Sequence, residues 1–326
     1  MIKSMNIAWW VQRWAELRPE KPAIIFEDQT ITYKALCRRA DRTACWLQSI
    51  GIEKGDRVAV MLHNCPEFID LFLACSRLGA IFVPINFRIT AVELDYFITN
   101  CRPRLFVYGD SVCDVVNSLE MEAYLPPLMV ACPGKKATNG KKVFDMVAET
   151  QKFDGRRAFL TRSLGPSNPE EPQVIMYTSG TTGKPKGAVL THRKTFFNCL
   201  NADIFFKLHN SDIMLVFLPL FHSGGLFIQA APIFYKGATI VLHPNFDPMR
   251  VYRDIEAYRV TKFLGVPTVY RELLKVPPES RSNISSLRVC AGGGEKLTED
   301  LFKKCTEAGL AFRQIMGQTE TSILLW

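Results

Sequence analysis

A segment rich in glycine, hydroxyl and lysine side chains offers the clearest chemistry in this sequence. It reads Thr178-Ser179-Gly180-Thr181-Thr182-Gly183-Lys184-Pro185-Lys186-Gly187, and these ten residues hold four hydroxyls, three glycines and two lysines. Backbone N–H groups that no bulky side chain shields can enclose phosphate oxygens, together with hydroxyl and ammonium donors. The spacing differs from that of a Walker P-loop. We therefore interpret the segment as a phosphate-binding loop rather than as a flexible glycine-rich hairpin.

Three consecutive glycines form a second candidate site. Gly292, Gly293 and Gly294, followed by Glu295, come directly after a predicted strand at 287–291. Glycines allow the backbone to approach another group closely, and ligands of open α/β sheets gather beyond the carboxyl ends of the strands. We favour a ligand contact here over a tight turn that only leads into the helix predicted from Thr298.

Two further segments place polar side chains beside apolar strands. His222 lies in the sequence Leu218-Pro219-Leu220-Phe221-His222-Ser223-Gly224-Gly225, where a histidine is by default a core or turn residue. The pair Thr319-Glu320 follows a short strand that ends near Gln314, and such a pair is by default solvated. From the residues alone, both segments remain open between a structural and a functional role.

The phosphate-loop segment resembles the signature of the AMP-binding, or adenylate-forming, superfamily, which includes acyl-CoA synthetases, luciferases and adenylation domains of peptide synthetases. Further matches follow in the family's order: Ile31-Thr32-Tyr33, then Gly55-Asp56-Arg57-Val58-Ala59, then Gly79-Ala80 leading to Val83-Pro84-Ile85-Asn86. The resemblance covers nearly the whole chain. It implies that ATP and Mg²⁺ activate a carboxylic acid as an acyl-adenylate, and that coenzyme A then accepts the acyl group.

The resemblance also implies roles for individual residues. Thr319 would contact the α-phosphate, and Glu320 would bind Mg²⁺, which in proteins commonly takes one or two carboxylates. His222 would line the acyl pocket near the substrate carboxylate. The segment from Gly292 to Glu295 would border the adenine and the acyl chain. Met316, followed by Gly317 and Gln318, stands where the family usually has an aromatic ring that stacks on adenine, and a methionine can still pack against the base.

The resemblance argues against an amino acid as the substrate. Relatives that activate amino acids usually place an aspartate where His222 stands, and no aspartate follows it nearby. The apolar neighbours Leu226, Phe227 and Ile228 favour a fatty or aryl acid. Two alternatives stay open: an enzyme that passes the acyl group to a carrier protein, and a nucleotide-binding module without activity.

The elements that must position these residues alternate between short apolar runs and helical patterns. Strands are predicted at 57–62, 81–84, 105–108, 261–265 and 287–291, and helices at 6–18, from Asn64 and Pro66 to 78, after Thr90, at 247–259 and from Pro267. This order predicts an α/β fold with parallel sheets covered by helices. The composition of 133–172 predicts a surface loop.

By resemblance, the chain forms the AMP-binding N-terminal domain of an adenylate-forming enzyme, as two parallel-sheet lobes packed together. One lobe would span about 55–195, and the other about 1–54 with 196–326. Relatives continue beyond the position of Trp326 with a ribose-binding aspartate, a hinge and a C-terminal domain that carries a catalytic lysine. We therefore expect an incomplete domain in which nucleotide binding is retained better than catalytic turnover.

Composition sets broad limits on the kind of protein. The chain has 326 residues, a formal net charge of +8 spread along its length, and ten cysteines without a CxxC pair. Scattered cysteines in apolar segments predict buried thiols in a reducing compartment, and hence a cytoplasmic protein. Polar residues interrupt the apolar stretch 213–235, so no membrane span is expected. Nothing indicates a nucleic-acid partner, and a homodimer is compatible with these features.

Overall fold

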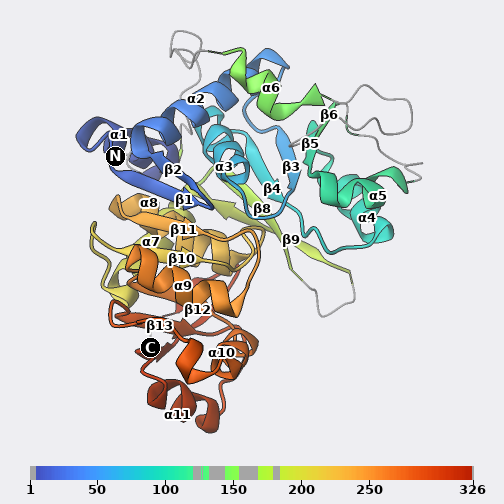
Figure 1. The fold of residues 1–326 in the computed structure, drawn as a ribbon. Helices are drawn as coiled ribbons and strands as arrows, with labels where there is room; N and C mark the ends of the chain where they lie inside the picture. Colours follow the sequence, from blue (N-terminus) through green and yellow to red (C-terminus); the bar gives the residue numbers. More distant parts are fainter. Residues whose placement is uncertain are drawn as a thin grey trace.

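Two mainly parallel β-sheets dominate the computed structural model, which describes residues 5–119, 126, 128–131, 144–153, 168–178 and 184–324 (Figure 1). The first sheet has the order β14-β13-β12-β10-β11-β1-β2 and the second has the order β7-β6-β5-β3-β4-β8-β9. Each sheet has one antiparallel pair at an edge, β1–β2 in the first and β8–β9 in the second. The predicted α/β class with two parallel-sheet lobes is confirmed.

The first sheet combines the N-terminal hairpin with the C-terminal half of the chain. Its strands are β1 (Pro22–Phe26), β2 (Gln29–Thr32), β10 (Ile213–Val216), β11 (Thr239–Leu242), β12 (Lys262–Gly265), β13 (Val289–Gly292) and β14 (Phe312–Gln314). The second sheet consists of β3 (Arg57–Met61), β4 (Ile81–Pro84), β5 (Leu105–Tyr108), β6 (Leu128–Ala131), β7 (Phe144–Asp145), β8 (Pro172–Thr178) and β9 (Lys186–Thr191).

Helices surround both sheets, and most begin at residues that the sequence suggests. They are α1 (Ile7–Leu17), α2 (Tyr33–Ser49), α3 (Pro66–Leu78), α4 (Ala91–Cys101), α5 (Cys113–Asn117), α6 (Met146–Gln151), α7 (His192–Phe206), α8 (Ala231–Lys236), α9 (Pro248–Tyr258), α10 (Pro267–Lys275) and α11 (Glu299–Glu307). The N-cap of α1 is Asn6, and Thr90 forms a capping box with Glu93 at α4. The N-cap of α11 is Thr298.

One continuous hydrophobic cluster joins the two halves. It contains side chains from both sheets and from α1, α2 and α3, and these three helices pack against one another. Ile24 of β1, Leu47 of α2 and Val60 of β3 are fully buried members of this cluster. The loops that leave the two sheets therefore start from a shared, rigid base.

Three expectations about the elements are wrong in detail. The segment 133–172 is not only loop, because α6 packs against α2, with Met146 buried and Asp145 capping the helix. The predicted strand 287–291 begins at Val289. The residues after β14 form a short hairpin of β15 (Met316–Gln318) and β16 (Ser322–Leu324), which the sequence reading did not contain.

Candidate active site

The predicted phosphate loop connects two antiparallel strands. Thr178 at the end of β8 pairs with Lys186 at the start of β9, and Tyr177 pairs with Gly187. Ser179, Gly180, Thr181, Thr182 and Gly183 lie outside the described residues. The described residues on either side of this segment, Thr178 and Lys186, are therefore held in the register of an antiparallel strand pair.

Aromatic residues of α4 anchor the base of this loop. The ring of Tyr177 stacks on Phe97 with a centroid distance of 4.4 Å, and its hydroxyl donates to Asn100 Oδ1 at 2.6 Å. The hydroxyl of Tyr96 donates to the carbonyl oxygen of Pro185 at 2.9 Å. The chain that enters and leaves the loop is thus attached to one helix.

Two exposed lysines and a packed glycine, Lys184, Lys186 and Gly187, lie at the end of the loop. Lys184 and Lys186 are exposed, and neither forms an ion pair in the described part of the chain. Gly187 instead has a packing role, because a Cβ there would lie 2.9 Å from Cγ2 of Ile175 and 3.5 Å from the ring of Tyr177. The two ammonium groups are the members of this set that remain available to an anion.

The remaining predicted residues lie on loops that leave one edge of the first sheet. Strands β10, β12, β13 and β14 are parallel, so their carboxyl ends lie at the same edge. The turn that holds His222 follows β10, Gly292 ends β13 with Gly293 and Gly294 directly after it, and Met316 follows β14. The three groups therefore lie at the same edge of the sheet, where β12 separates the strand before the His222 turn from the strand that ends in Gly292.

The three glycines are explained first by close packing. A Cβ on Gly292 would come within 2.2 Å of the ring of Phe312, and a Cβ on Gly293 within 2.4 Å of the carbonyl oxygen of Ile315. Gly294 has φ +87°, a left-handed conformation that favours glycine. The backbone N–H of Ile315 donates to Gly292 O at 2.8 Å, which brings the glycine segment next to Met316. Glu295 is exposed beside them.

The pair Thr319-Glu320 occupies the turn between β15 and β16. Thr319 is buried, whereas Glu320 and the preceding residues Met316, Gly317 and Gln318 are exposed. In the described part of the chain the Glu320 carboxylate makes no hydrogen bond. Met316 is about half exposed (49%), so its side chain offers an apolar surface on β15.

Sequence reasoning missed a lysine that contacts this turn. Lys194 lies in the first turn of α7, and its Nζ donates to the carbonyl oxygen of Thr319 at 2.7 Å. Burial lowers the pKa of the Lys194 ammonium to about 8, and the negative charge of Glu320 partly opposes that shift. A lysine in the first turn of a helix opposes the helix dipole, but the sequence alone does not show which distant group it contacts.

Sequence reasoning also misassigned Asn64, which it placed at the start of a helix. The N-cap of α3 is Cys65, without a side-chain cap bond. The buried Asn64 side chain instead accepts from Leu220 N at 2.7 Å and donates to the carbonyl oxygens of Leu218 at 3.0 Å and His243 at 3.1 Å. This asparagine of the second sheet's lobe therefore fixes the turn that carries His222.

The His222 side chain is exposed at the surface of that turn, and partial desolvation lowers the pKa of its imidazole below the ordinary value. Its backbone N–H donates to Pro219 O at 3.1 Å. Gly225 lies under the same turn, where a Cβ would come within 2.4 Å of Pro219 O. The turn is thus rigid while the imidazole stays accessible.

A cleft of about 240 Å³ lies on the other side of Asn64. It is lined by residues that follow strands of both sheets: Asn64, Phe87, Arg88, Phe217, Leu218, Pro219, Pro244, Asn245, Phe246, Val266, Thr268 and Val269. The guanidinium of Arg88 is exposed and lies over the ring of Phe87. The ring of Phe87 meets that of Phe221, the neighbour of His222, at 5.3 Å. The cleft therefore adjoins the His222 turn and has a positive charge beside it.

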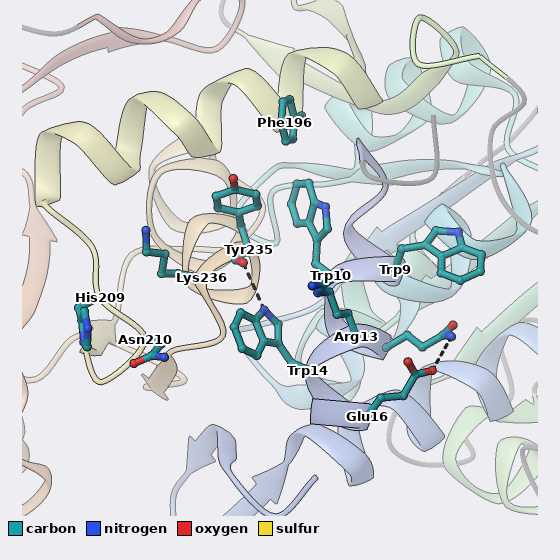
Figure 2. Close-up of a pocket in the computed structure, with 11 residues that line it drawn as sticks. Trp9, Trp10, Arg13, Trp14, Glu16, Phe196, His209, Asn210, Tyr235 and Lys236 are labelled. Carbon is teal, nitrogen blue, oxygen red and sulfur yellow. Dashed lines mark hydrogen bonds between the residues drawn. The ribbon is translucent and has the colours of Figure 1, made fainter. Parts of the chain in front are cut away.

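A larger concavity of about 890 Å³ lies elsewhere, between α1, α7 and α8 (Figure 2). Trp10 packs edge-on against Tyr235 at 5.1 Å, and the indole N–H of Trp14 donates to Tyr235 O. None of the residues that line it belongs to the predicted site. We therefore place the candidate site at the loops described above and not at the larger concavity.

The described residues offer neither a membrane-spanning helix nor a cluster of metal ligands. No described helix combines the length and the apolar character that crossing a membrane requires. No group of three or more His, Cys, Asp and Glu side chains in the described part could hold a metal ion.

Comparison with known proteins identifies relatives over nearly the whole chain. A profile of the family described as AMP-binding enzyme matches residues 11–326. The indoleacetate–CoA ligase of Aromatoleum aromaticum is 35% identical over 97% of this chain and 60% of its own length. The feruloyl-CoA synthase of Amycolatopsis is 32% identical over 98% of this chain and 61% of its own length. This chain thus spans about three fifths of these curated relatives.

A solved structure supports the same fold. The inhibitor-bound N-terminal domain of FACL13 from Mycobacterium tuberculosis superposes with a TM-score of 0.86 and 27% identity. The match covers 97% of this chain and 76% of that one.

Proposed function

The chain belongs to the family of AMP-binding enzymes, and on that premise we propose that its protein uses ATP to convert a carboxylic acid into an acyl-adenylate and then into a coenzyme A thioester. The observation that carries the proposal is the meeting of several loops at one sheet edge. The His222 turn follows β10 and the glycine segment ends β13. The β15–β16 hairpin that carries Thr319 and Glu320 follows β14, and the first turn of α7, directly after β9, contacts Thr319.

The proposed chemistry has two displacement steps. In the first, a carboxylate oxygen of the acid bonds to the α-phosphorus of ATP, and pyrophosphate leaves with the electrons of the broken P–O bond. In the second, the thiol of coenzyme A loses its proton and its sulfur bonds to the acyl carbon. The bond between the acyl carbon and the phosphate oxygen breaks, and AMP leaves. Catalysis of the first step would depend on positioning and on charge stabilisation.

The chain's own residues would supply most of these contacts. The loop Thr178–Gly187, with Lys184 and Lys186, would bind the triphosphate, Thr319 the α-phosphate, and Met316 to Gln318 the adenine side together with Gly292 to Glu295. Mg²⁺ would neutralise phosphate charge. Glu320 suits a Mg²⁺ ligand because its carboxylate is exposed, and the lack of a larger acidic cluster in the described part means that phosphates would provide further ligands.

For the acid, we propose an aryl or fatty acid that lies beside His222. The segment after this histidine is the π-helix η4 (Gly224–Ala230), in which Leu226 and Phe227 are buried and Ile228 is partly buried. The relatives' names specify aryl acids, ferulate and indoleacetate, which favours the aryl class.

For the acceptor, we propose that the thiol arm of coenzyme A enters the cleft beside Asn64. The cleft ends at the His222 turn, and the exposed Arg88 guanidinium could pair with a phosphate of the cofactor. A carrier protein would present a similar thiol arm, so it is the competing acceptor. Most of the described cysteines are buried, as expected for thiols in a reducing compartment, and this supports a cytoplasmic location.

A substrate panel tests this proposal. The natural protein that contains this chain would be incubated with ATP, Mg²⁺, coenzyme A and, in turn, ferulate, indole-3-acetate, phenylacetate, octanoate or palmitate. We expect AMP and the acyl-CoA by mass spectrometry, with at least one aryl acid preferred over palmitate. Thioester on a phosphopantetheinylated carrier protein but not on coenzyme A would reject the acceptor, and AMP formation without dependence on any acid would reject the function.

A further inference from the structure

Lys194 carries a positive charge where its surroundings disfavour one, and no role in the predicted site has been assigned to it. It lies in the first turn of α7, where its backbone N–H donates to the side chain of the N-cap Thr191. The positive end of the helix dipole opposes a cation there. The side chain is also partly buried, which lowers the pKa of the ammonium. Both effects cost free energy that a bound anion would offset.

The contacts of the ammonium define where such an anion would lie. Nζ donates to Thr319 O at 2.7 Å and lies 4.9 Å from the centroid of the Phe227 ring. Phe227 is fully buried in η4, on the acyl side of the proposed site. Thr319 lies on the phosphate side. Lys194 therefore contacts both sides at once.

We propose that Lys194 binds the ionised carboxylate of the acid and presents it to the α-phosphorus, an inference that rests on the function proposed above. The carboxylate must lie where the acyl group and the α-phosphate meet, and Lys194 reaches that junction. An ammonium has three N–H donors, and in the described part of the chain one of them is used, by Thr319 O. The other two can bind a carboxylate oxygen while the Thr319 bond stays intact.

A purely structural reading is that Lys194 only attaches α7 to the Thr319 turn. Two variants separate the readings. Lys194→Gln keeps an N–H donor for Thr319 O but removes the charge, whereas Lys194→Met keeps the packing on Phe227 and removes both. If Lys194 is only an attachment, Gln should behave like the wild type. If it binds the carboxylate, Gln and Met should be equally impaired.

The matched control is Lys236 of α8, another partly buried lysine with one described partner, Asp203 at 2.7 Å. It lines the concavity of Figure 2, away from the predicted site. Lys236→Met should change thermal stability without changing the affinity for the acid.

The experiment measures acid and ATP affinities separately in the natural protein that contains this chain. The acid is the member of the panel above that the wild-type protein binds most tightly by calorimetry, and its Kd in each variant is measured alongside the KM values. We expect Lys194→Gln and Lys194→Met to raise the Kd and KM for the acid at least tenfold and to leave the KM for ATP within about twofold. Lys194→Arg should restore most of the affinity because it keeps the charge.

Two outcomes would overturn the assignment. One is an unchanged acid Kd in Lys194→Gln, which would leave only the attachment role. The other is a rise in the KM for ATP with the acid unaffected, which would place Lys194 on a phosphate. Since calorimetry needs no turnover, wild-type protein that binds the acid but makes no thioester would contradict the proposed function and leave the comparison of variants valid.

Discussion

Replacing Glu320 by glutamine is expected to reduce adenylate formation at least 100-fold, which corresponds to about 2.7 kcal/mol of transition-state stabilisation. The carboxylate lies in the β15–β16 turn, is exposed, and makes no hydrogen bond in the described part of the chain. Glutamine keeps the shape but removes the charge that would bind Mg²⁺. The melting temperature should shift by no more than about 2 °C, because exposed substitutions are usually nearly neutral.

Acid-dependent pyrophosphate exchange and differential scanning fluorimetry on the same samples check this expectation. Glu256→Gln, an exposed glutamate on α9, is the control and should leave both readings unchanged. Retained exchange together with a much lower melting temperature in Glu320→Gln would make Glu320 a structural residue.

The second large effect is expected in the phosphate loop. Replacing Thr181, Thr182 and Lys186 together by alanine should weaken ATP binding at least tenfold, or about 1.4 kcal/mol, which is less than one charge-assisted hydrogen bond can contribute. Tyr96 and Phe97 of α4 hold the hairpin at Pro185 and Tyr177, so these changes should not disturb the base of the loop.

Calorimetry with ATP and Mg²⁺ measures the change. The control is a triple variant of exposed residues elsewhere, Thr30→Ala, Ser285→Ala and Lys303→Ala, which removes the same chemical groups. Equal ATP affinity in the loop variant and this control would mean that the loop does not bind the triphosphate.

Much of the fold could be predicted because local signals agree with the tertiary structure. The capping box of Thr90 and Glu93, the N-cap Asn6 and the prolines at the starts of α9 and α10 each define a helix end by short-range chemistry. Alternating strands and helices then determine parallel sheets. The short helix α6 was not predicted from the sequence. Its residue Met146 is buried in the folded chain, where α6 packs against α2, and such tertiary packing leaves no local signal.

The residues of the candidate site could be predicted only where consecutive residues form a recognisable pattern. The phosphate loop is recognisable from its composition alone. Asn64 and Lys194 are not, because their partners lie far along the chain, at Leu220 and Thr319, and an asparagine before a helix is usually a cap. The sequence indicated that the backbone at Gly292 and Gly293 approaches another group closely. The groups beside these two glycines are Phe312 and Ile315 of the chain itself.

Tracing the oxygen atoms of the acid tests the acyl-adenylate most directly. The natural protein that contains this chain would be given its preferred acid with oxygen-18 in the carboxylate, together with ATP, Mg²⁺ and coenzyme A, and the nucleotide product would be weighed by mass spectrometry. Attack of the carboxylate on the α-phosphorus predicts AMP that carries one oxygen-18 atom for each thioester formed. Unlabelled nucleotide, with the label found in inorganic phosphate beside ADP, would contradict the account.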